Sequence, residues 1–421
     1  MLASLHHRTR KSLAAIGLLV VALLGNCSLI AQDYTLVIKG GHVIDAKNNI
    51  NEVMDVGIKD DKIVRVAKNI DAKGAQVVDA KGLYVTPGLI DIHSHNFYGT
   101  QDDHYLSDGY VAVAPDGFTF RSGVTTVADA GGAGWKNFNQ FNNQTIKNSD
   151  TRVFSFLNIV GEGMRGGAWE QNLNDMDAKM TASVVKAHKN EIVGIKVAHY
   201  MGAEWEPVDR AVEAGKAANV PVMIDFGGNN PPLSIEDLFM KHLRPGDIFT
   251  HCFAQLSSRE AIVDDQGKLK SFIVAAQKRG IIFDVGHGGG SFRFSQAIPA
   301  LKAGFIPNTI STDLHTGSMN AGMKDQLNIM SKFLNMGMNV QQVMAASTWH
   351  PAQAIKHEEL GHLSPGAVAD VAVFSLQKGK FGFIDSGGFR MDGDQKLETE
   401  LTVRAGKVVW DLNGISRPSW K

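Results

Sequence analysis

Cysteine is scarce in this chain. Its 421 residues include two cysteines, Cys27 and Cys252. We expect Cys27 to be removed with the first thirty residues, and the single remaining thiol cannot form an internal disulfide. A small secreted fold held together by disulfides is therefore excluded, and the mature chain must be stabilised by packing.

Neither sign of charge is in excess, and no long run of one sign occurs. The chain has 42 Lys and Arg against 43 Asp and Glu, a formal net charge of −1. A phosphate backbone is bound by clustered cations, so we expect no nucleic-acid partner. With 44% hydrophobic residues, the chain can bury the core of one large α/β domain and a smaller one.

The chain also lacks an apolar run that could span a membrane stably. The run 13–24 follows a basic stretch at 8–11, but it falls short of the roughly 20 residues that a spanning helix needs. A basic start, a short apolar run and then small or polar residues are typical of a secretory signal. We predict a signal peptide over 1–31, cleaved near Ala31, and a periplasmic or secreted protein. Lipid anchoring at Cys27 is the less favoured alternative.

The pattern of the remaining chain changes twice. Short β-like runs separated by Gly, Asn and Asp turns occupy 32–86, and a similar pattern returns over 364–421. We predict that these two ends pair into one small β-sandwich. Between them, residues 87–363 alternate short apolar strands with amphipathic stretches, which is typical of βα units around a parallel sheet.

Eight such units in about 275 residues fit the size of a closed barrel. The predicted fold class is therefore α/β, a (β/α)8 TIM barrel with a small β-sandwich domain formed from both chain ends. The eight predicted strands are 89–93, 125–129, 153–159, 193–198, 220–226, 248–252, 281–285 and 309–313.

Two histidines lie at the end of the first predicted barrel strand. Because side chains alternate along a strand, His93 and His95 project to the same side, where neutral ring nitrogens can share a divalent metal. An isolated His-x-His is more often two ordinary surface histidines. The interpretation therefore depends on the other strand ends, where the reactive groups of a barrel gather.

Four further strands carry or end in metal-ligating side chains. Together with the two histidines, they predict one metal site at the mouth of the barrel, formed by His93, His95, Lys196, Asp225, His251 and Asp313.

Lys196 stands in an apolar strand, where a charged amine is costly. An uncharged amine can react with carbon dioxide to give an anionic carbamate that bridges two metals. The alternative is a lysine that reaches solvent. His251 and Cys252 face opposite sides of their strand, so we predict His251 to be the ligand and Cys252 a packing residue.

Asp313 is the predicted general base, because it could bind one metal and take the proton from the attacking water. The alternative is an aspartate that caps the following helix. Three further residues are weaker candidates for contact with the substrate. His315 could instead orient Asp313. His287 could also stabilise charge on the carbonyl oxygen or be a loop histidine without such a role, and Arg165 could clamp a substrate carboxylate or be a solvated loop arginine.

The motifs together resemble the amidohydrolase superfamily, within it the dihydroorotase-like branch that contains deacetylases and acetyl-ester hydrolases. The resemblance covers nearly the whole mature chain. It is carried by PGLIDIHSH at 87–95, SGVTTVADAG at 122–131, FLNI at 156–159, GIKV at 194–197, FDVGHG at 283–288 and PGAVAD at 365–370.

This resemblance implies two zinc ions bridged by hydroxide and by carboxylated Lys196. His93, His95 and Asp313 would hold one ion, and strands five and six the other. The chain departs from the family pattern at one position, since Asp225 stands where a histidine is expected. The extra negative charge leaves the metal identity open between zinc and a harder divalent ion.

The leading hypothesis is an exported metal-dependent amidohydrolase or deacetylase that removes a small acyl group from an amide or ester of a small molecule. One alternative is a cyclic amidase or lactonase, with dihydroorotase-like ring opening. An alternative of another class is a non-catalytic binding protein on a degenerate barrel. The residues do not determine the substrate or whether the barrel forms homo-oligomers.

Overall fold

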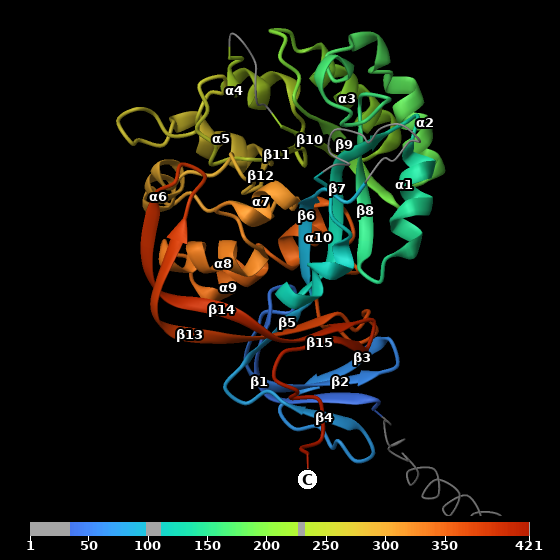
Figure 1. The fold of residues 1–421 in the computed structure, drawn as a ribbon, viewed down its shortest axis with the longest axis vertical. Helices are drawn as coiled ribbons and strands as arrows, with labels where there is room; N and C mark the ends of the chain where they lie inside the picture. Colours follow the sequence, from blue (N-terminus) through green and yellow to red (C-terminus); the bar gives the residue numbers. More distant parts are fainter. Residues whose placement is uncertain (1–33, 98–110, 226–231, 421) are drawn as a thin grey trace, which may run out of the picture.

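Two groups of strands organise the part of the chain that the structure describes. The computed structural model describes residues 34–97, 111–225 and 232–420, so the predicted signal peptide and Cys27 lie outside the described residues. A barrel-like α/β part lies above a smaller β part in Figure 1. Among the described helices, none combines the length and apolar character that a membrane span requires.

The barrel-like part is built on one curled sheet of seven parallel strands, in the order β12-β11-β10-β9-β8-β7-β6. All residues of β6, β7 and β9 are buried, as expected of parallel strands covered on both faces. The first seven predicted strands are confirmed, although β10, β11 and β12 are shorter than predicted. The bounds are β6 Leu89–Ser94, β7 Val124–Gly134, β8 Arg152–Asn158, β9 Ile192–Val197, β10 Val222–Ile224, β11 Ile248–Phe249 and β12 Ile282–Phe283.

The eighth predicted strand, 309–313, is extended chain rather than a regular strand. Isolated parallel bridges join Thr309 to Asp284 on one side and Leu314 to Ser94 on the other. The segment 309–314 therefore lies between the last and first strands of the sheet. Its regular pairing is interrupted at Asp313, whose φ of 56° is left-handed.

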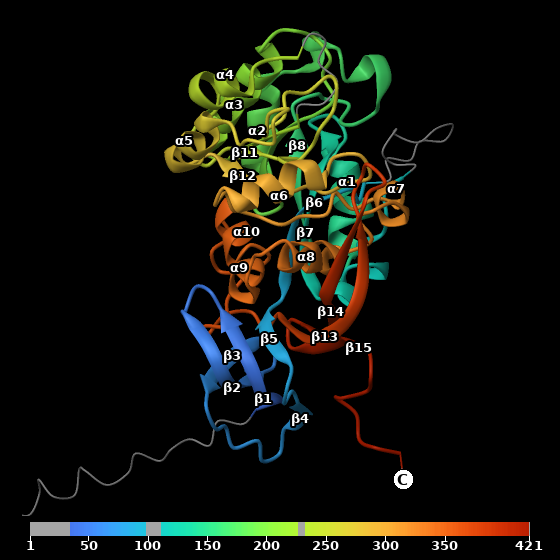
Figure 2. The same cartoon turned by 90° about the vertical axis from the view of Figure 1, so that its left-hand side faces the viewer.

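Helices cover the outside of this sheet (Figures 1 and 2). Local sequence defines their ends: the Asp177 side chain accepts hydrogen bonds from the backbone at the start of α2, and Asn219 adopts the left-handed conformation at the end of α3. The bounds are α1 Phe138–Gln144, α2 Ala178–Ala187, α3 Glu206–Ala218, α4 Ile235–Asp237, α5 Ser271–Arg279, α6 Phe294–Lys302, α7 Thr316–Asn320, α8 Gln326–Asn335, α9 Val340–Ala345 and α10 Trp349–Ala354.

The smaller part is a mixed sheet to which both ends of the described chain contribute. Its order is β15-β14-β13-β5-β1-β2-β3, with β4 paired to β1. The predicted pairing of the two ends is confirmed by the antiparallel register of β5 and β13. The strands join into one sheet rather than two separate sheets. They are β1 Leu36–Asp45, β2 Ile50–Lys59, β3 Lys62–Ala67, β4 Gln76–Asp79, β5 Tyr84–Pro87, β13 Val371–Ile384, β14 Arg390–Arg404 and β15 Lys407–Asp411.

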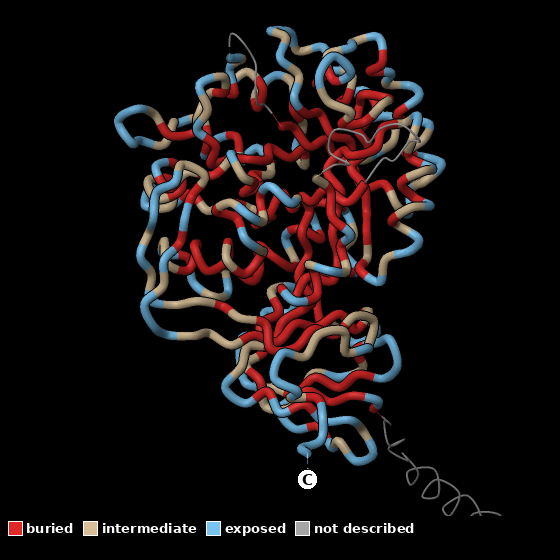
Figure 3. Tube along the Cα trace, in the orientation of Figure 1, coloured by how far each residue is buried: buried red, intermediate tan, exposed pale blue. Residues whose placement is uncertain are grey.

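The long β13–β14 hairpin leaves this sheet and runs along the barrel-like part (Figure 2). Register shifts within the hairpin allow it to bend. Its middle packs on α8, where the Leu397 amide donates to Ser331 Oγ at 3.0 Å and Asn335 Nδ2 donates to the Gln395 carbonyl at 2.8 Å. Figure 3 shows buried residues continuing from one part into the other. The C-terminal strands therefore support both parts.

Asp370 is a further link between the two parts. Arg152 Nη1 lies 2.6 Å from one of its carboxylate oxygens, and Arg404 Nη1 lies 3.3 Å from the other. Its backbone carbonyl also accepts a hydrogen bond from the Gly88 amide, directly before β6.

We predict that Asp370→Ala lowers the free energy of unfolding by about 3 kcal/mol, because it leaves two partly buried guanidinium groups without their carboxylate. Denaturant unfolding followed by circular dichroism measures the change. The control is Glu52→Ala, which removes the exposed pair with Lys68 and should cost less than about 1 kcal/mol. Equal losses in the two variants would contradict the predicted role of Asp370.

Candidate metal centre

Two of the predicted ligands come from one strand and a third from its neighbour. His93 and His95 lie at the end of β6 and just beyond it, and Asp313 comes from the extended segment beside this strand. Asp313 Oδ1 lies 2.8 Å from His95 Nε2 and 3.6 Å from His93 Nε2. The three side chains are buried, and their ligand atoms lie within 4.8 Å of one another. They form a compact set of donors for one cation.

The other three predicted ligands lie against this set. Lys196 projects from β9, Asp225 follows β10 and His251 follows β11. Lys196 Nζ is 3.3 Å from His93 Nε2 and 3.9 Å from Asp225 Oδ2, and His251 Nε2 is 3.1 Å from the same Asp225 oxygen. The structure thus brings all six predicted ligands together, with Lys196 between the two groups.

The tautomer of His93 follows from its neighbours. The Thr250 hydroxyl has one proton and donates it to Asp284 Oδ2 at 2.7 Å, since a carboxylate only accepts. The Thr250 oxygen must therefore accept from His93 Nδ1, 2.8 Å away. His93 Nε2 is left without a proton and directs its lone pair toward Lys196 and Asp313. Metal-ligating histidines usually donate from the other ring nitrogen in this way, which fixes the orientation of the ring.

His251 has its tautomer fixed in the same way. Its Nδ1 lies 2.5 Å from the carbonyl oxygen of Gly286, which accepts only, so Nδ1 carries the proton. In the neutral imidazole, Nε2 then directs a lone pair at Asp225 Oδ2. Two lone pairs that face each other at 3.1 Å repel unless a cation lies between them or the ring takes a second proton.

The protonation states suit metal binding. Burial, with the positive charge of Lys196 adding to it, lowers the pKa of His93 to about 3, so the ring is neutral near pH 7. Burial alone would raise the pKa of Asp313, but the hydrogen bond with His95 and the charge of the nearby histidines hold it below its ordinary value. The pKa of Asp225 is also held well below its ordinary value, since its charged neighbours, above all His251 and Lys196, outweigh burial.

This donor set therefore fits a divalent cation. Imidazole nitrogens and ionised carboxylates converge in a buried space, and the set contains no thiolate. Cys252 packs in the hydrophobic core on the other side of its strand, as predicted, and burial raises the pKa of its thiol.

Two of the six predicted ligands are among the nine described residues that have a Cβ and a positive φ. His251 has a φ of 54° and Asp313 a φ of 56°, in the left-handed region that residues with a Cβ rarely adopt. Such conformations cost about 1–3 kcal/mol and persist where the surroundings enforce them, often at functional sites. The left-handed turns at His251 and Asp313 also explain why regular strand pairing is short here. β11 ends at Phe249, and the eighth segment is held by isolated bridges.

Two buried aspartates support the site, and the sequence analysis missed both. Asp284 accepts hydrogen bonds from Thr250, Thr309 and Ser311 and so orders the strand ends around His93. Asp91 accepts from the backbone amides of His93 and Thr312, and burial raises its pKa to about 7. The available signal was a lone carboxylate within an apolar strand, which is costly unless it is bonded.

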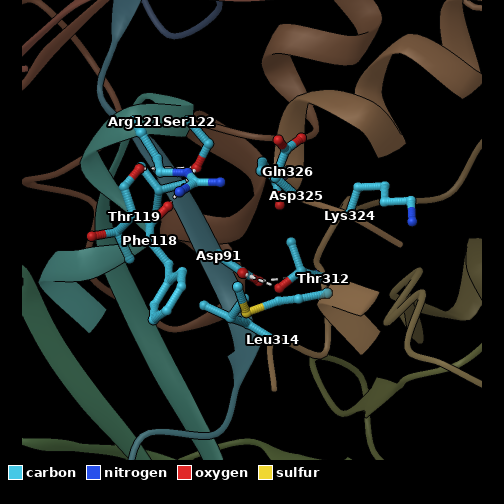
Figure 4. Close-up of a pocket in the computed structure, with 12 residues that line it drawn as sticks. Asp91, Phe118, Thr119, Arg121, Ser122, Thr312, Leu314, Lys324, Asp325 and Gln326 are labelled. Carbon is cyan, nitrogen blue, oxygen red and sulfur yellow. Dashed lines mark hydrogen bonds between the residues drawn. The ribbon is translucent and has the colours of Figure 1, made fainter. Parts of the chain in front are cut away.

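Asp91 and Thr312 meet at a small cavity beside the site (Figure 4). The cavity is about 20 Å³, room for about one water molecule. The Asp91 carboxylate joins β6 to the extended segment that carries Asp313, so it holds the ligands of the first set in register.

The three weaker candidates have different surroundings. His315 caps α7 through Nδ1, which accepts from the Gly317 and Ser318 amides, so its Nε2–H is directed toward Asp313 Oδ2 at 3.8 Å. This geometry favours the orienting role, and it also means that the residue capping α7 is His315 rather than Asp313.

His287 and Arg165 are engaged in other contacts. The His287 ring is fully buried, stacks on Phe292 and places Nε2 2.7 Å from Lys332 Nζ. Arg165 Nη1 lies 3.1 Å from Glu162, with the guanidinium over the Trp169 ring. For these two residues, contact with a substrate stays a prediction.

Comparison with known proteins agrees with the geometry. The Amidohydrolase family matches residues 294–409. A deacetylase from Brucella anthropi is 34% identical over 338 residues, covering 78% of this chain and 81% of that protein. Two solved structures, an adenine deaminase and a dihydroorotase, have TM-scores of 0.80 and 0.77 at 27% and 28% identity. They cover 90% and 89% of this chain, and 100% and 99% of their own chains.

We predict that Thr250→Val weakens metal binding about 10- to 100-fold, because His93 loses the group that fixes its tautomer. Thr250→Ser keeps the hydroxyl and should bind nearly as well as the parent chain. Competition with a chromogenic chelator measures the affinity. Equal weakening in both variants would point to a packing effect and contradict the hydrogen-bond relay.

Proposed function

Since the chain belongs to the amidohydrolase family and is a hydrolase acting on carbon–nitrogen bonds, we propose that it is a metal-dependent deacetylase of an N-acylated or O-acetylated small molecule. The observation that carries the proposal is the convergence of His93, His95, Lys196, Asp225, His251 and Asp313 in one buried site. A non-catalytic binding protein would need none of these groups, and the family relationship gives that alternative no support.

Two divalent ions, with zinc favoured, would be held at this site. His93, His95 and Asp313 would hold one ion, and Asp225 and His251 would contribute to the other. When bound, such ions lower the pKa of water and polarise a carbonyl oxygen. We also propose that segment 309–314 completes the (β/α)8 barrel, since it bonds to strands on both sides.

Lys196 is proposed to be carboxylated and to bridge the two ions. Its side chain is fully buried, and an ammonium there would face the ring of His93. The neutral amine forms an N–C bond to carbon dioxide and releases one proton, which replaces a buried cation with an anionic ligand.

Asp313 is proposed to be the general base. Its carboxylate is ionised near neutral pH, and His95 and His315 orient it from two sides. It would take a proton from the attacking water and return it to the leaving nitrogen or oxygen, which balances the hydrolysis.

Opening of a cyclic amide is the second candidate, favoured by the likeness to a dihydroorotase over nearly the whole chain. Parallel assays with N-acetyl compounds and with cyclic amides or lactones separate the two functions. Acyl release without ring opening supports the deacetylase, and the reverse result supports the cyclic amidase. We further propose export to the periplasm or the medium, which mass spectrometry of the mature N-terminus would test.

We predict that the purified chain, kept in bicarbonate, contains about two divalent ions per chain. Lys196→Ala should lose them, because the bridging ligand is gone. Elemental analysis of dialysed protein measures the content, and the Asp370→Ala variant, altered outside the site, should retain it. A parent chain without bound metal would overturn the proposed mechanism.

For Asp313→Asn we predict a kcat lower by about 10²–10⁴, since the amide cannot accept the proton. The assay is acyl release from an N-acetyl or O-acetyl substrate under saturating metal. A variant with parent-like kcat would assign the base to another residue.

A further inference from the structure

His199 is a histidine that the sequence analysis did not select, and it lies at the second half of the site. It follows β9, the strand that carries Lys196, by two residues. Its Nε2 is 3.8 Å from Asp225 Oδ2, and its side chain is 47% exposed. Asp225 is the residue that stands where the family pattern expects a histidine.

The proton on His199 can be assigned from its other contact. His199 Nδ1 lies 3.0 Å from Glu170 Oε2, and the Glu170 side chain is only 4% exposed. The second oxygen of Glu170 accepts from the Gly166 amide at 2.9 Å, which fixes the carboxylate in place. A carboxylate accepts, so Nδ1 carries a proton, and Nε2 is the ring nitrogen that faces Asp225 and could bind a metal. In a metal-ligating histidine, one ring nitrogen usually binds the metal and the other donates a hydrogen bond to a carboxylate.

The backbone at His199 has the same strain as the ligands. Its φ is 56°, beside 54° at His251 and 56° at Asp313. Six other described residues with a Cβ also have a positive φ, so the conformation supports the assignment only together with the contacts of His199. Left-handed residues with a Cβ are costly and are often found at functional sites.

We propose that His199 supplies the nitrogen ligand that Asp225 replaces, so that Asp225, His251 and His199 together hold the second ion beside Lys196. The inference rests on the proposed function. Nitrogen and oxygen ligands bound at about 2.0–2.2 Å to one ion lie roughly 3–4 Å apart. Three nitrogen atoms lie at such a distance from Asp225 Oδ2: His251 Nε2 at 3.1 Å, His199 Nε2 at 3.8 Å and Lys196 Nζ at 3.9 Å. Among the described residues, the histidine and carboxylate ligand atoms that already lie within 4.8 Å of one another are those of His93, His95 and Asp313, so the rings of His199 and His251 must move closer together when the second ion binds.

The carboxylate at position 225 is also balanced electrically. The side chain of Arg259 is 3% exposed, and its Nη1 lies 3.9 Å from Asp225 Oδ1. The guanidinium thus faces one carboxylate oxygen and leaves the other directed at His251 and His199. Arg259 offsets the negative charge that Asp225 adds, so the net charge around the second ion stays close to that of a site with a neutral histidine at this position.

The test is metal content and affinity in His199→Ala, in Asp225→His and in the double variant, all kept in bicarbonate with zinc. His199→Ala should lose one of the two ions, or bind it at least about 10-fold more weakly. The double variant should regain it, since Asp225→His restores a histidine on strand five. Cobalt substitution gives a second readout, because the absorption bands of the second ion should change in His199→Ala.

His188→Ala is the matched control, since His188 also lies near a glutamate, Glu191, at 4.0 Å, but precedes the opposite end of β9. It should keep both ions, and thermal unfolding of each variant verifies that it is folded. Glu170→Gln should weaken the second ion about 10-fold if Glu170 positions the ring.

The results distinguish the inference from the proposed function. A parent chain without metal overturns the proposed function. If the parent chain binds two ions and His199→Ala keeps both with unchanged affinity, His199 is not a ligand, but the proposed function stands. If that variant keeps both ions and changes KM alone, His199 is a substrate-binding residue and the ligand assignment is wrong.

Discussion

The hydrogen-bond relay from Asp284 through Thr250 to His93 is the interaction on which the site depends. A neutral imidazole can present a lone pair at either ring nitrogen, and only the relay selects Nε2. The Gly286 carbonyl does the same for His251. With these tautomers fixed, the lone pairs of the ring nitrogens face carboxylate oxygens in a buried space. These groups repel one another, and a bound cation would remove the repulsion.

That arrangement constrains the strands around it. Ligands at the ends of several strands must turn into one mouth, and the chain accomplishes this by leaving the strand early in a left-handed conformation. His251 and Asp313 both do so, which shortens β11 and leaves the eighth segment held by single bridges. The positions of the ligands are therefore maintained at the expense of regular β pairing, and the surrounding hydrogen bonds must compensate for the strain.

The smaller sheet also supports the site at a distance. The tip of the β13–β14 hairpin contacts the loop after β12, where the Phe294 amide donates to Asp385 and the Phe292 amide to Ser386. Phe292 stacks on His287, whose neighbouring glycines lie against the ligands. A change in this hairpin can therefore reach the candidate metal site through packed rings, although the hairpin contributes none of the candidate ligands.

Local patterns in the sequence were enough to select the candidate ligands. The two-residue period of a strand pairs His93 with His95, a charged amine inside an apolar strand singles out Lys196, and a carboxylate at the end of an apolar run singles out Asp313. It also predicted the first seven barrel strands and the pairing of the two chain ends. The tertiary structure alone decided that Asp284 and Thr250 orient His93, that Arg259 faces Asp225, and that His199 lies beside it. Periodicity in the sequence records only which face of an element is buried. The contacts of Asp284, Arg259 and His199 join segments far apart in the chain. Their geometry is set by packing and by left-handed turns that no local pattern specifies.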